Sequence, residues 1–337
     1  MIETLSSIYG RAAAWRRAWY VRHPERRNRL ARPVISVGNL RVGGSLKTPV
    51  VAYIARLLLD RGERPAVLSR GYARRAPQAG VTVVSDGKSV LADLDAAGDE
   101  PLMLAQSIAG ALVIVGADRY LAGCLAERRL GATVHILDDG FQHFELARDL
   151  DLLLACEEDL RDRPLPAGRL RETIAAATHA DVALVSARDL CDAERVGRAL
   201  GLEMCFRVIR AFGSPRQVCG AAPANVPLGA RVFAVAGIAR PERFFADVAS
   251  AGWQVAGTMV FRDHHPFDSR DLARIAAASS HAGAAAVVTT DKDAVRFRAS
   301  DANELARLAM AAIPLDVAIE PAERFRQLLF ERLFCAT

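Results

Sequence analysis

Short apolar runs alternate with helical stretches along most of the chain from residue 33 onward. These runs are continuous and rich in β-branched residues, which is typical of strands buried on both faces of a parallel sheet. Six such strands are expected in the first part of the chain, at residues 33–37, 65–69, 112–115, 134–138, 150–155 and 182–186. A second series follows at residues 232–236, 254–257 and 285–289. The alternation of strands and helices predicts the α/β class.

The two series of strands predict two domains joined by a short hinge, which suits a length of 337 residues. Between them, residues 211–228 are rich in Gly, Pro and Ala, as expected of a boundary. Residues 206–210 and 315–319 are predicted to pair as a two-stranded hinge. The expected organisation is an N-terminal segment (1–32), a large α/β domain (33–210), a smaller α/β domain (211–314), and a hinge strand with a C-terminal helix (315–337).

The first 32 residues predict an amphipathic, basic helix. They contain eight arginines against Glu3 and Glu25, a net charge of +6, whereas the whole chain carries only +5. Apolar residues follow three- and four-residue steps on one face: Leu5, Ile8, Tyr9, Ala12, Trp15 and Trp19. Arginine and tryptophan suit the headgroup layer of an anionic membrane, and we favour that role. The alternative is a helix packed on its own domain with a solvated basic face, and Arg16 within the apolar stripe supports it.

Other features of composition narrow the class of protein. The six cysteines are scattered without a C-x-x-C pair, which predicts reduced, buried thiols in a cytosolic compartment. No secretory signal pattern and no apolar run of about 18 residues occurs, so a spanning helix is not expected. The chain beyond residue 32 is close to neutral, which argues against nucleic-acid binding.

Residues 34–49 read as a buried strand, a glycine-rich loop, and then Lys47-Thr48 opening a helix. This is the context of a phosphate-binding P-loop, in which loop amides cradle the phosphates, the lysine bridges β/γ oxygens and the threonine ligates magnesium. A tight turn with an exposed lysine is the less favoured alternative. The predicted nucleotide-binding residues are Arg41, Val42, Gly43, Gly44, Ser45, Leu46, Lys47, Thr48 and, at the end of a later strand, Arg70.

Leu46 departs from this P-loop pattern, because glycine normally precedes the lysine. Glycine there allows the backbone to approach the phosphates closely. A leucine is therefore expected to crowd the phosphates, and to strain the loop if its φ is positive.

Three further strings contain acids and histidines. Asp138-Asp139 follow the apolar run of residues 134–137, as in a Walker B element that holds Mg²⁺. Asp99-Glu100 precede a proline at a helix start, where they could be catalytic or simple caps. In the string Phe261-Arg-Asp-His-His-Pro-Phe267, a histidine beside an aspartate could accept a proton at neutral pH.

In this order and spacing, the P-loop and the strings SRGY, GDEP, LDDGFQH and DHHPF resemble the tetraacyldisaccharide 4′-kinase family of lipid A biosynthesis. The resemblance extends through residues 165–172, 236–245 and 290–296. It implies a P-loop-like parallel-sheet domain plus a smaller α/β domain, with the active site in the cleft between them. It also implies transfer of the ATP γ-phosphate to the 4′-hydroxyl of a tetraacyldisaccharide 1-phosphate.

The resemblance also assigns roles to individual residues. The implied catalytic residues are Asp99, Lys47 and His264, with His265 as the lesser choice of histidine. The implied metal ligands are Thr48, Glu100, Asp138 and Asp139, and the supporting residues are His143, Asp263 and His265. Leu46, and Gly168-Arg169 in place of an expected Gly-Pro, depart from the family pattern. A catalytically weakened or silent nucleotide- or lipid-binding homologue is therefore the alternative.

The expected cofactors are ATP and Mg²⁺, and the expected partners are a lipid A disaccharide precursor and an anionic membrane surface. We expect no nucleic-acid partner, a monomer, and a peripheral location at the cytoplasmic face of the inner membrane.

Overall fold

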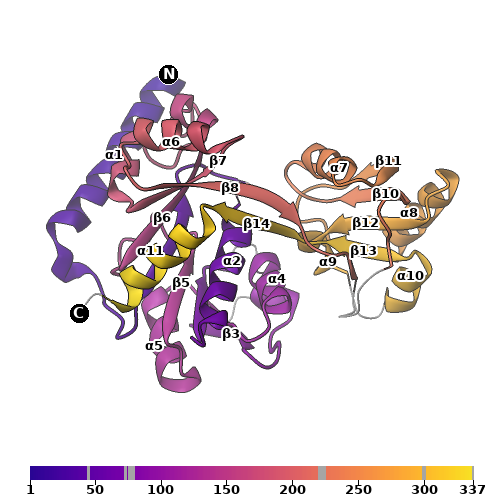
Figure 1. Ribbon diagram of the computed structural model, residues 1–337, viewed down its shortest axis with the longest axis horizontal. Coiled ribbons are helices and arrows are strands. Elements are labelled where there is room, and N and C mark those ends of the chain that lie inside the picture. The colour runs from indigo at the N-terminus through magenta and orange to yellow at the C-terminus, as the bar shows by residue number, and fades with distance from the viewer. Residues whose placement is uncertain (44–45, 72–73, 75–79, 219–224, 298–300, 336–337) are drawn as a thin grey trace. The chain divides into compact units, whose positions relative to one another are not determined.

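The structure is a computed structural model that describes all residues except 44–45, 72–73, 75–79, 219–224, 298–300 and 336–337. The chain forms two compact units (Figure 1). Unit 1 comprises Met1–Arg210 and Val317–Thr337, and unit 2 comprises Ala211–Asp316.

Unit 1 is built on a nine-stranded sheet. Its strands are β1 (Val34–Asn39), β2 (Pro65–Ser69), β3 (Val81–Asp86), β4 (Leu112–Gly116), β5 (Val134–Asp138), β6 (Leu150–Cys156), β7 (Val182–Ser186), β8 (Cys205–Phe212) and β14 (Leu315–Glu320). They lie in the order β14-β8-β7-β6-β1-β5-β2-β4-β3. Neighbouring strands from β8 to β4 pair in parallel, and β3 pairs antiparallel with β4. The predicted α/β class with a mainly parallel sheet is confirmed.

The helices of unit 1 follow the strands as the alternating sequence pattern predicted. They are α1 (Ile2–Arg22), α2 (Lys47–Asp60), α3 (Leu94–Ala97), α4 (Asp99–Ser107), α5 (Arg119–Leu130), α6 (Leu190–Ala199) and α11 (Ala322–Phe334), with 3-10 turns η1 (Pro24–Arg26), η2 (Glu157–Arg161) and η3 (Ile174–His179). Helices α2 and α4 lie side by side (Figure 1). Helix α11 packs on unit 1 through Phe325, whose ring lies 5.2 Å from that of Phe206.

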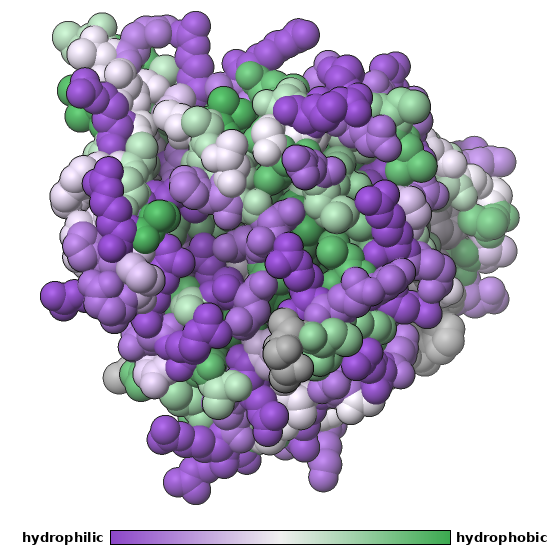
Figure 2. All heavy atoms as spheres, turned by 60° about the vertical axis from the view of Figure 1, so that its left-hand side comes forward, coloured by the Kyte–Doolittle hydropathy of each residue, from purple (hydrophilic) through white to green (hydrophobic). Residues whose placement is uncertain are grey.

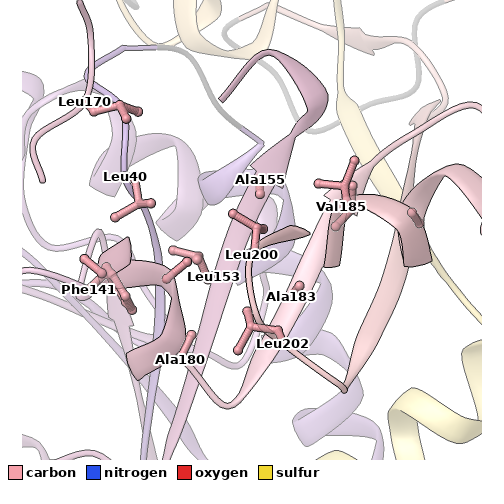
Figure 3. Packing of buried hydrophobic residues seen from close by; sticks show 14 residues of the cluster. Leu40, Phe141, Leu153, Ala155, Leu170, Ala180, Ala183, Val185, Leu200 and Leu202 are labelled. Atoms are coloured by element: carbon pink, nitrogen blue, oxygen red, sulfur yellow. The ribbon is translucent and has the colours of Figure 1, made fainter. Parts of the chain in front are cut away.

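A core cluster connects the sheet of unit 1 to two loops that follow its strands (Figure 3). Leu153 of β6 and Ala183 of β7 pack in it together with Leu40, which directly follows β1. Phe141, which lies beyond the end of β5, is fully buried in the same cluster. Burial of one large side chain is worth about 1.5–3 kcal/mol, so these contacts fix both loops against the sheet.

Glycine at position 38 permits these two loops to approach each other. A Cβ atom on Gly38 would lie 2.5 Å from Cβ and 2.7 Å from the backbone nitrogen of Phe141. Any side chain at this position would therefore push away the loop that follows β5.

Unit 2 contains a five-stranded sheet in the order β11-β10-β12-β13-β9. Its strands are β9 (Arg216–Gln217), β10 (Arg231–Ala236), β11 (Gln254–Val260), β12 (Ala286–Thr290) and β13 (Met310–Ile313), and its helices are α7 (Pro241–Ser250), α8 (Ser269–His281), α9 (Asp291–Ala294) and α10 (Ala302–Arg307). Strands β10 to β13 run parallel, and β9 is antiparallel to β13.

Several sequence expectations differ from the structure in detail. The segments predicted to pair as a two-stranded hinge lie within β8 and β14, which are neighbouring strands, so the predicted pairing is present; the two strands also belong to the nine-stranded sheet. Strands β3, β9 and β13 were not predicted. The expectation that the thiols are buried is wrong for Cys191 and Cys335, which are exposed. The thiols that are half-buried are Cys124, Cys156 and Cys205, and Cys219 lies outside the described residues.

Helix α1 packs on unit 1 through a face different from its apolar stripe. Its buried residues are Ser6, Gly10 and Arg17, spaced four and seven residues apart on one side of the helix. The residues of the apolar stripe that are exposed include Leu5, Ile8, Tyr9, Ala12 and Trp15, of which Trp15 is 68% exposed. One face therefore packs on the rest of unit 1, as the alternative expected, while the apolar face is exposed, and contact with a membrane stays a prediction.

Candidate active site

The carboxyl ends of three neighbouring parallel strands of unit 1 bring together the sequence motifs. Strands β1 and β5 pair so that Val37 lies opposite Asp138, and β2 lies on the other side of β5. The P-loop follows β1, the acidic pair ends β5, and Arg70 follows β2. In open α/β sheets, ligands bind at the carboxyl ends of the strands.

Lys47, the first residue of α2, lies in an ion pair with the acidic pair that follows β5. Its Nζ atom donates hydrogen bonds to Oδ1 of Asp139 at 2.8 Å and to Oδ1 of Asn39 at 3.3 Å. Arg171 approaches the same carboxylate, with its guanidinium nitrogen 2.8 and 2.7 Å from the two oxygens of Asp139. One carboxylate therefore holds two cationic side chains at the end of the sheet.

The backbone and charge of Asp139 are both unusual. Its φ is 57°, in the left-handed region that non-glycine residues rarely adopt, although aspartate tolerates it better than most. Burial alone would raise the pKa of Asp139, but Lys47 and Arg171 outweigh burial and lower that pKa. Asp139 therefore stays ionised and fixes the position of the P-loop lysine.

Asp138 lies in a different environment. It is buried, and Oγ of Ser69 donates to its Oδ2 atom at 3.4 Å. Burial and the neighbouring Glu100 carboxylate raise the pKa of Asp138 to about 7, while Lys47 opposes the rise. A bound divalent cation would relieve the repulsion between these carboxylates.

The residues present fit Mg²⁺ as an ion shared with a nucleotide. Thr48 is buried in the first turn of α2, and Asp138 ends β5 beside Glu100. Among the residues that the structure describes, no group of three His, Cys, Asp or Glu side chains could hold a metal by itself. Mg²⁺ is usually held by one or two carboxylates together with substrate phosphates and water.

Asp99 begins helix α4, directly after Gly98, whose φ of 84° turns the chain between α3 and α4. Its side chain is 9% exposed, and Glu100 follows it in the same first turn. A helix N-terminus favours an ionised carboxylate by about 0.3–1 kcal/mol. This position is thus compatible with both interpretations of the GDEP string, a catalytic role and a simple helix start.

The remaining predicted nucleotide-binding residues differ in their surroundings. Arg41 is buried, and its Nε atom lies 2.6 Å from Oδ1 of Asp159. Val42 is exposed, Gly43 has a φ of 88°, and Arg70 is exposed at the end of β2. Gly44 and Ser45 lie outside the described residues.

Burial lowers the pKa of two basic side chains in this part of unit 1, Arg119 and His143. Arg119, at the start of α5, is buried close to Arg70 and the two aspartates, and burial lowers its pKa. His143 is partly buried, and burial with the nearby Arg119 and Arg148 lowers its pKa to about 4. His143 is therefore neutral at pH 7. Arg119 was not predicted from the sequence, although it follows a predicted strand by a few residues.

A polar network links α1 to this site, and most of it was not predicted from the sequence. Arg17 donates two hydrogen bonds of 2.7 Å to the carboxylate of Glu172, and both side chains are buried. Glu172 also accepts from Gln142 at 3.1 Å, and Oε1 of Gln142 accepts from Arg171 at 3.2 Å. The network reaches Asp139 through Arg171. One signal was present in the sequence, because Gln142 lies within LDDGFQH and both Arg171 and Glu172 end the string at residues 165–172.

In unit 2, the DHHPF string follows β11 at the carboxyl edge of the parallel sheet. His265 is engaged structurally, because its Nε2 lies 2.7 Å from Oδ2 of Asp271 and its ring stacks on Phe261. His264 has a φ of 60°, and its side chain is 33% exposed. Asp263 accepts a hydrogen bond from the backbone of His264 and lies 3.8 Å from Lys292. This arrangement favours His264 over His265 as the reactive histidine.

The backbone of Leu46 does not have the positive φ that would strain the loop. It precedes the first residue of α2 with a φ of −70°, which any L-residue adopts readily, and its carbonyl accepts the first helical hydrogen bond from Val50. The predicted conformational penalty is therefore absent, and only the volume of the side chain remains to weaken nucleotide binding.

We expect Leu46→Gly to tighten binding of a non-hydrolysable ATP analogue by less than about tenfold, a gain of under 1.4 kcal/mol. The reason is that glycine relieves no backbone strain at a negative φ. Isothermal titration of both proteins measures the difference. A gain of tenfold or more would show that the leucine side chain itself lies against the phosphates.

A glycine-rich loop between a buried strand and a helix that begins with Lys-Thr, next to an acidic strand end, defines a P-loop phosphotransferase. The comparisons with known proteins give the family. The family described as tetraacyldisaccharide-1-P 4′-kinase matches residues 1–333, and the chain belongs to this family.

Relatives cover nearly the full length of the chain. A tetraacyldisaccharide 4′-kinase of Geobacter metallireducens is 42% identical over 303 residues, covering 88% of each chain. One from Syntrophus aciditrophicus is 36% identical over 358 residues, covering 99% of this chain and 92% of the relative. The crystal structure of LpxK from Aquifex aeolicus in complex with ATP matches with a TM-score of 0.80 at 30% identity, covering 99% of this chain and 98% of that one. The family and the fold expected from the sequence are both confirmed.

Proposed function

We propose that this chain transfers the γ-phosphate of ATP to the 4′-hydroxyl of a tetraacyldisaccharide 1-phosphate in lipid A biosynthesis. The observation that carries the proposal is the Lys47–Asp139–Arg171 cluster at the end of β1 and β5. Both cations are held in place before any phosphate arrives. Preorganised charge of this kind is the main source of acceleration in phosphoryl transfer.

Lys47 and Arg171 supply the positive charge in this proposal. When ATP occupies the P-loop, Lys47 bridges its terminal phosphates, and Asp139 keeps the ammonium group oriented. Arg171 contacts the same carboxylate and adds a second cation next to the first.

Asp99 is the proposed general base, which accepts the proton of the 4′-hydroxyl as that oxygen attacks the γ-phosphorus. The histidine proposed to assist is His264 of the DHH string. The buried position of Asp99 in the first turn of α4 keeps it close to Glu100 and the metal side of the site.

Mg²⁺ would be held by Thr48 and Asp138, with Glu100 nearby, and when bound it neutralises charge on the β- and γ-phosphate oxygens. Asp139 serves the lysine and arginine instead, because its two oxygens already accept from both.

The alternative of a catalytically silent homologue is not favoured. The relatives with which the chain aligns over most of its length are named as kinases. The described residues of the site are also intact, since Lys47 and Asp139 are paired and Asp99 is held in its helix.

The proposed activity is tested by incubating the protein with Mg²⁺, γ-labelled ATP and a tetraacyldisaccharide 1-phosphate in detergent micelles. We expect label to enter the lipid, and ADP to form at the same rate. Release of free phosphate without labelled lipid would contradict the proposal and identify a nucleotide hydrolase.

We also propose that the protein acts as a peripheral protein at the cytoplasmic face of the inner membrane, as a monomer, and that α1 contacts the bilayer. Among the residues described, no helix combines the length and apolar character needed to cross a membrane. Figure 2 presents the side of the molecule that lies at the left in Figure 1, where apolar surface occurs between hydrophilic side chains. Exposed Leu5, Ile8 and Trp15 on α1 are suited to the interface of a bilayer.

We expect the triple substitution Leu5→Ser, Ile8→Ser and Trp15→Ser to reduce binding to anionic vesicles at least tenfold, because each apolar side chain contributes about 1 kcal/mol or more on insertion. Vesicle co-sedimentation measures the effect. Point substitutions are preferable to deletion of α1, which would remove Arg17 and leave Glu172 buried without its cation.

The matched control is Val90→Ser with Leu91→Ser, which removes exposed apolar side chains elsewhere on unit 1. The control should bind vesicles like the wild type. Unchanged co-sedimentation of the α1 variant would contradict the proposed membrane contact.

A further inference from the structure

A buried ion pair lies directly behind the loop of unit 2 that contains the DHH string. Arg296 and Asp293 are 2% and 0% exposed, and their side chains are 2.7 Å apart. The proposed chemistry gives neither of them a role.

Three segments at the carboxyl edge of the sheet converge on this pair. Oδ2 of Asp293 accepts hydrogen bonds from the backbone of Gly237, after β10, at 3.0 Å and from the hydroxyl of Thr290, at the end of β12, at 2.7 Å. Arg296 donates to the carbonyl of Gly237 at 2.8 Å. The approach is close, because a Cβ on Gly237 would lie 3.1 Å from Asp293 and 3.2 Å from the carbonyl of Arg262.

The third segment is the DHH loop itself. The guanidinium NH2 group of Arg296 lies 3.5 Å from Nδ1 of His264, whose own φ is 60°. On the other side of the ring, Nε2 lies 3.9 Å from Oδ2 of Asp263. The imidazole is therefore placed between a cation at Nδ1 and a carboxylate at Nε2.

This placement favours one tautomer of the ring. An arginine side chain has only N–H donors and does not lose its proton in proteins. Donation from Arg296 to Nδ1 across this 3.5 Å contact uses a lone pair on that nitrogen, which favours the tautomer with its proton on Nε2. The carboxylate of Asp263 near Nε2 favours the same tautomer.

We propose that Arg296 is a positioning residue for the reaction, which holds His264 in the tautomer with its proton on Nε2, so that this histidine acts as a hydrogen-bond donor. Asp293 in turn fixes Arg296. Under this proposal, Asp99 alone takes the proton of the substrate hydroxyl, and His264 donates a hydrogen bond without exchanging a proton. The kinetic part of the inference rests on the proposed function.

The experiment combines kinetics with nuclear magnetic resonance of the ring nitrogens. Arg296→Lys keeps a positive charge against Asp293 but loses the planar fork that reaches His264. We expect it to lower kcat at least tenfold with KM for ATP unchanged. In a His264→Ala background the same substitution should change kcat less than twofold, because the residue through which Arg296 acts is gone.

Two further variants test the donor role. Glutamine can present an amide N–H near the position of Nε2, whereas the shorter asparagine reaches only the position of Nδ1. His264→Gln should therefore retain at least tenfold more activity than His264→Asn. Equal loss in both variants, or an equal effect of Arg296→Lys in the wild-type and His264→Ala backgrounds, would overturn the proposal.

The resonance measurement does not depend on catalysis. In full-length protein labelled with ¹⁵N-histidine, long-range ¹H–¹⁵N spectra should assign the proton of His264 to Nε2 in the wild type and a mixture of tautomers in Arg296→Lys. A proton on Nδ1 in the wild type would overturn the inference even if the protein is an active kinase. If the spectra are as expected but no lipid is phosphorylated, the proposed function has failed and the placement of the histidine stands.

Discussion

Lys47→Ala should lower kcat/KM for ATP by roughly 10²–10³-fold or more, the loss typical of removing one preorganised charge from a transition state. The ammonium group is already held by Asp139 and Asn39, so the wild type needs no rearrangement to receive the phosphates. The fold should tolerate the change, because Arg171 still neutralises Asp139. Steady-state kinetics and thermal unfolding measure the two effects separately.

The matched control for this prediction is Lys88→Ala, an exposed lysine in the turn that follows β3 of the same unit. It should leave kcat/KM unchanged. Activity of Lys47→Ala within a few-fold of the wild type would contradict the assignment of the P-loop.

Asp99→Asn should lower kcat by roughly 10²–10⁴-fold, the usual loss when a general base is removed, with KM for ATP little changed. Asparagine has nearly the same shape but cannot accept the proton of the hydroxyl. The measurement is the rate of lipid phosphorylation at saturating ATP, with nucleotide affinity determined by titration.

Asp93→Asn provides the control, because Asp93 caps α3 with a hydrogen bond from Ala96 and asparagine is an equally good cap. Its turnover should match the wild type. If Asp99→Asn retained wild-type turnover, Asp99 would have no chemical role, and the GDEP string would be only a helix start.

Local pattern predicted most of the fold of unit 1, for a physical reason. Strands that are buried on both faces must be apolar at every position, as in β4 and β5, and such runs stand out in a sequence. Strand β3 was missed because it lies at the edge of the sheet and alternates between buried and partly buried residues. Strand β9 is only two residues long, so it leaves no periodic signal.

Most motif residues of the site were predicted because they lie at or just after the end of a strand, whereas Asp99 begins helix α4. Their partners were not, since Arg171 and Glu172 lie about 30 residues beyond Asp139 and only the folded chain brings them together. The same limit applies to Arg296, whose contact with His264 spans 32 residues.

The amphipathic periodicity of helix α1 does not predict which of its faces packs on the rest of unit 1. The pattern identified an apolar face correctly, but an apolar face usually packs inward. Here a second face with Ser6 and Gly10 packs on unit 1, because small side chains permit close approach: a Cβ on Gly10 would lie 3.2 Å from Pro164 and Thr173. The buried Arg17 is neutralised by Glu172, which no periodicity reveals.

The most direct test of the central claim is the position of the new phosphate on the lipid. After reaction of tetraacyldisaccharide 1-phosphate with ATP, ³¹P–¹H correlation spectra should connect a second phosphomonoester to the proton on C4′. The product should be absent with Lys47→Ala under the same conditions. A phosphate on any other hydroxyl, or conversion of the 1-phosphate to a diphosphate, would contradict the account.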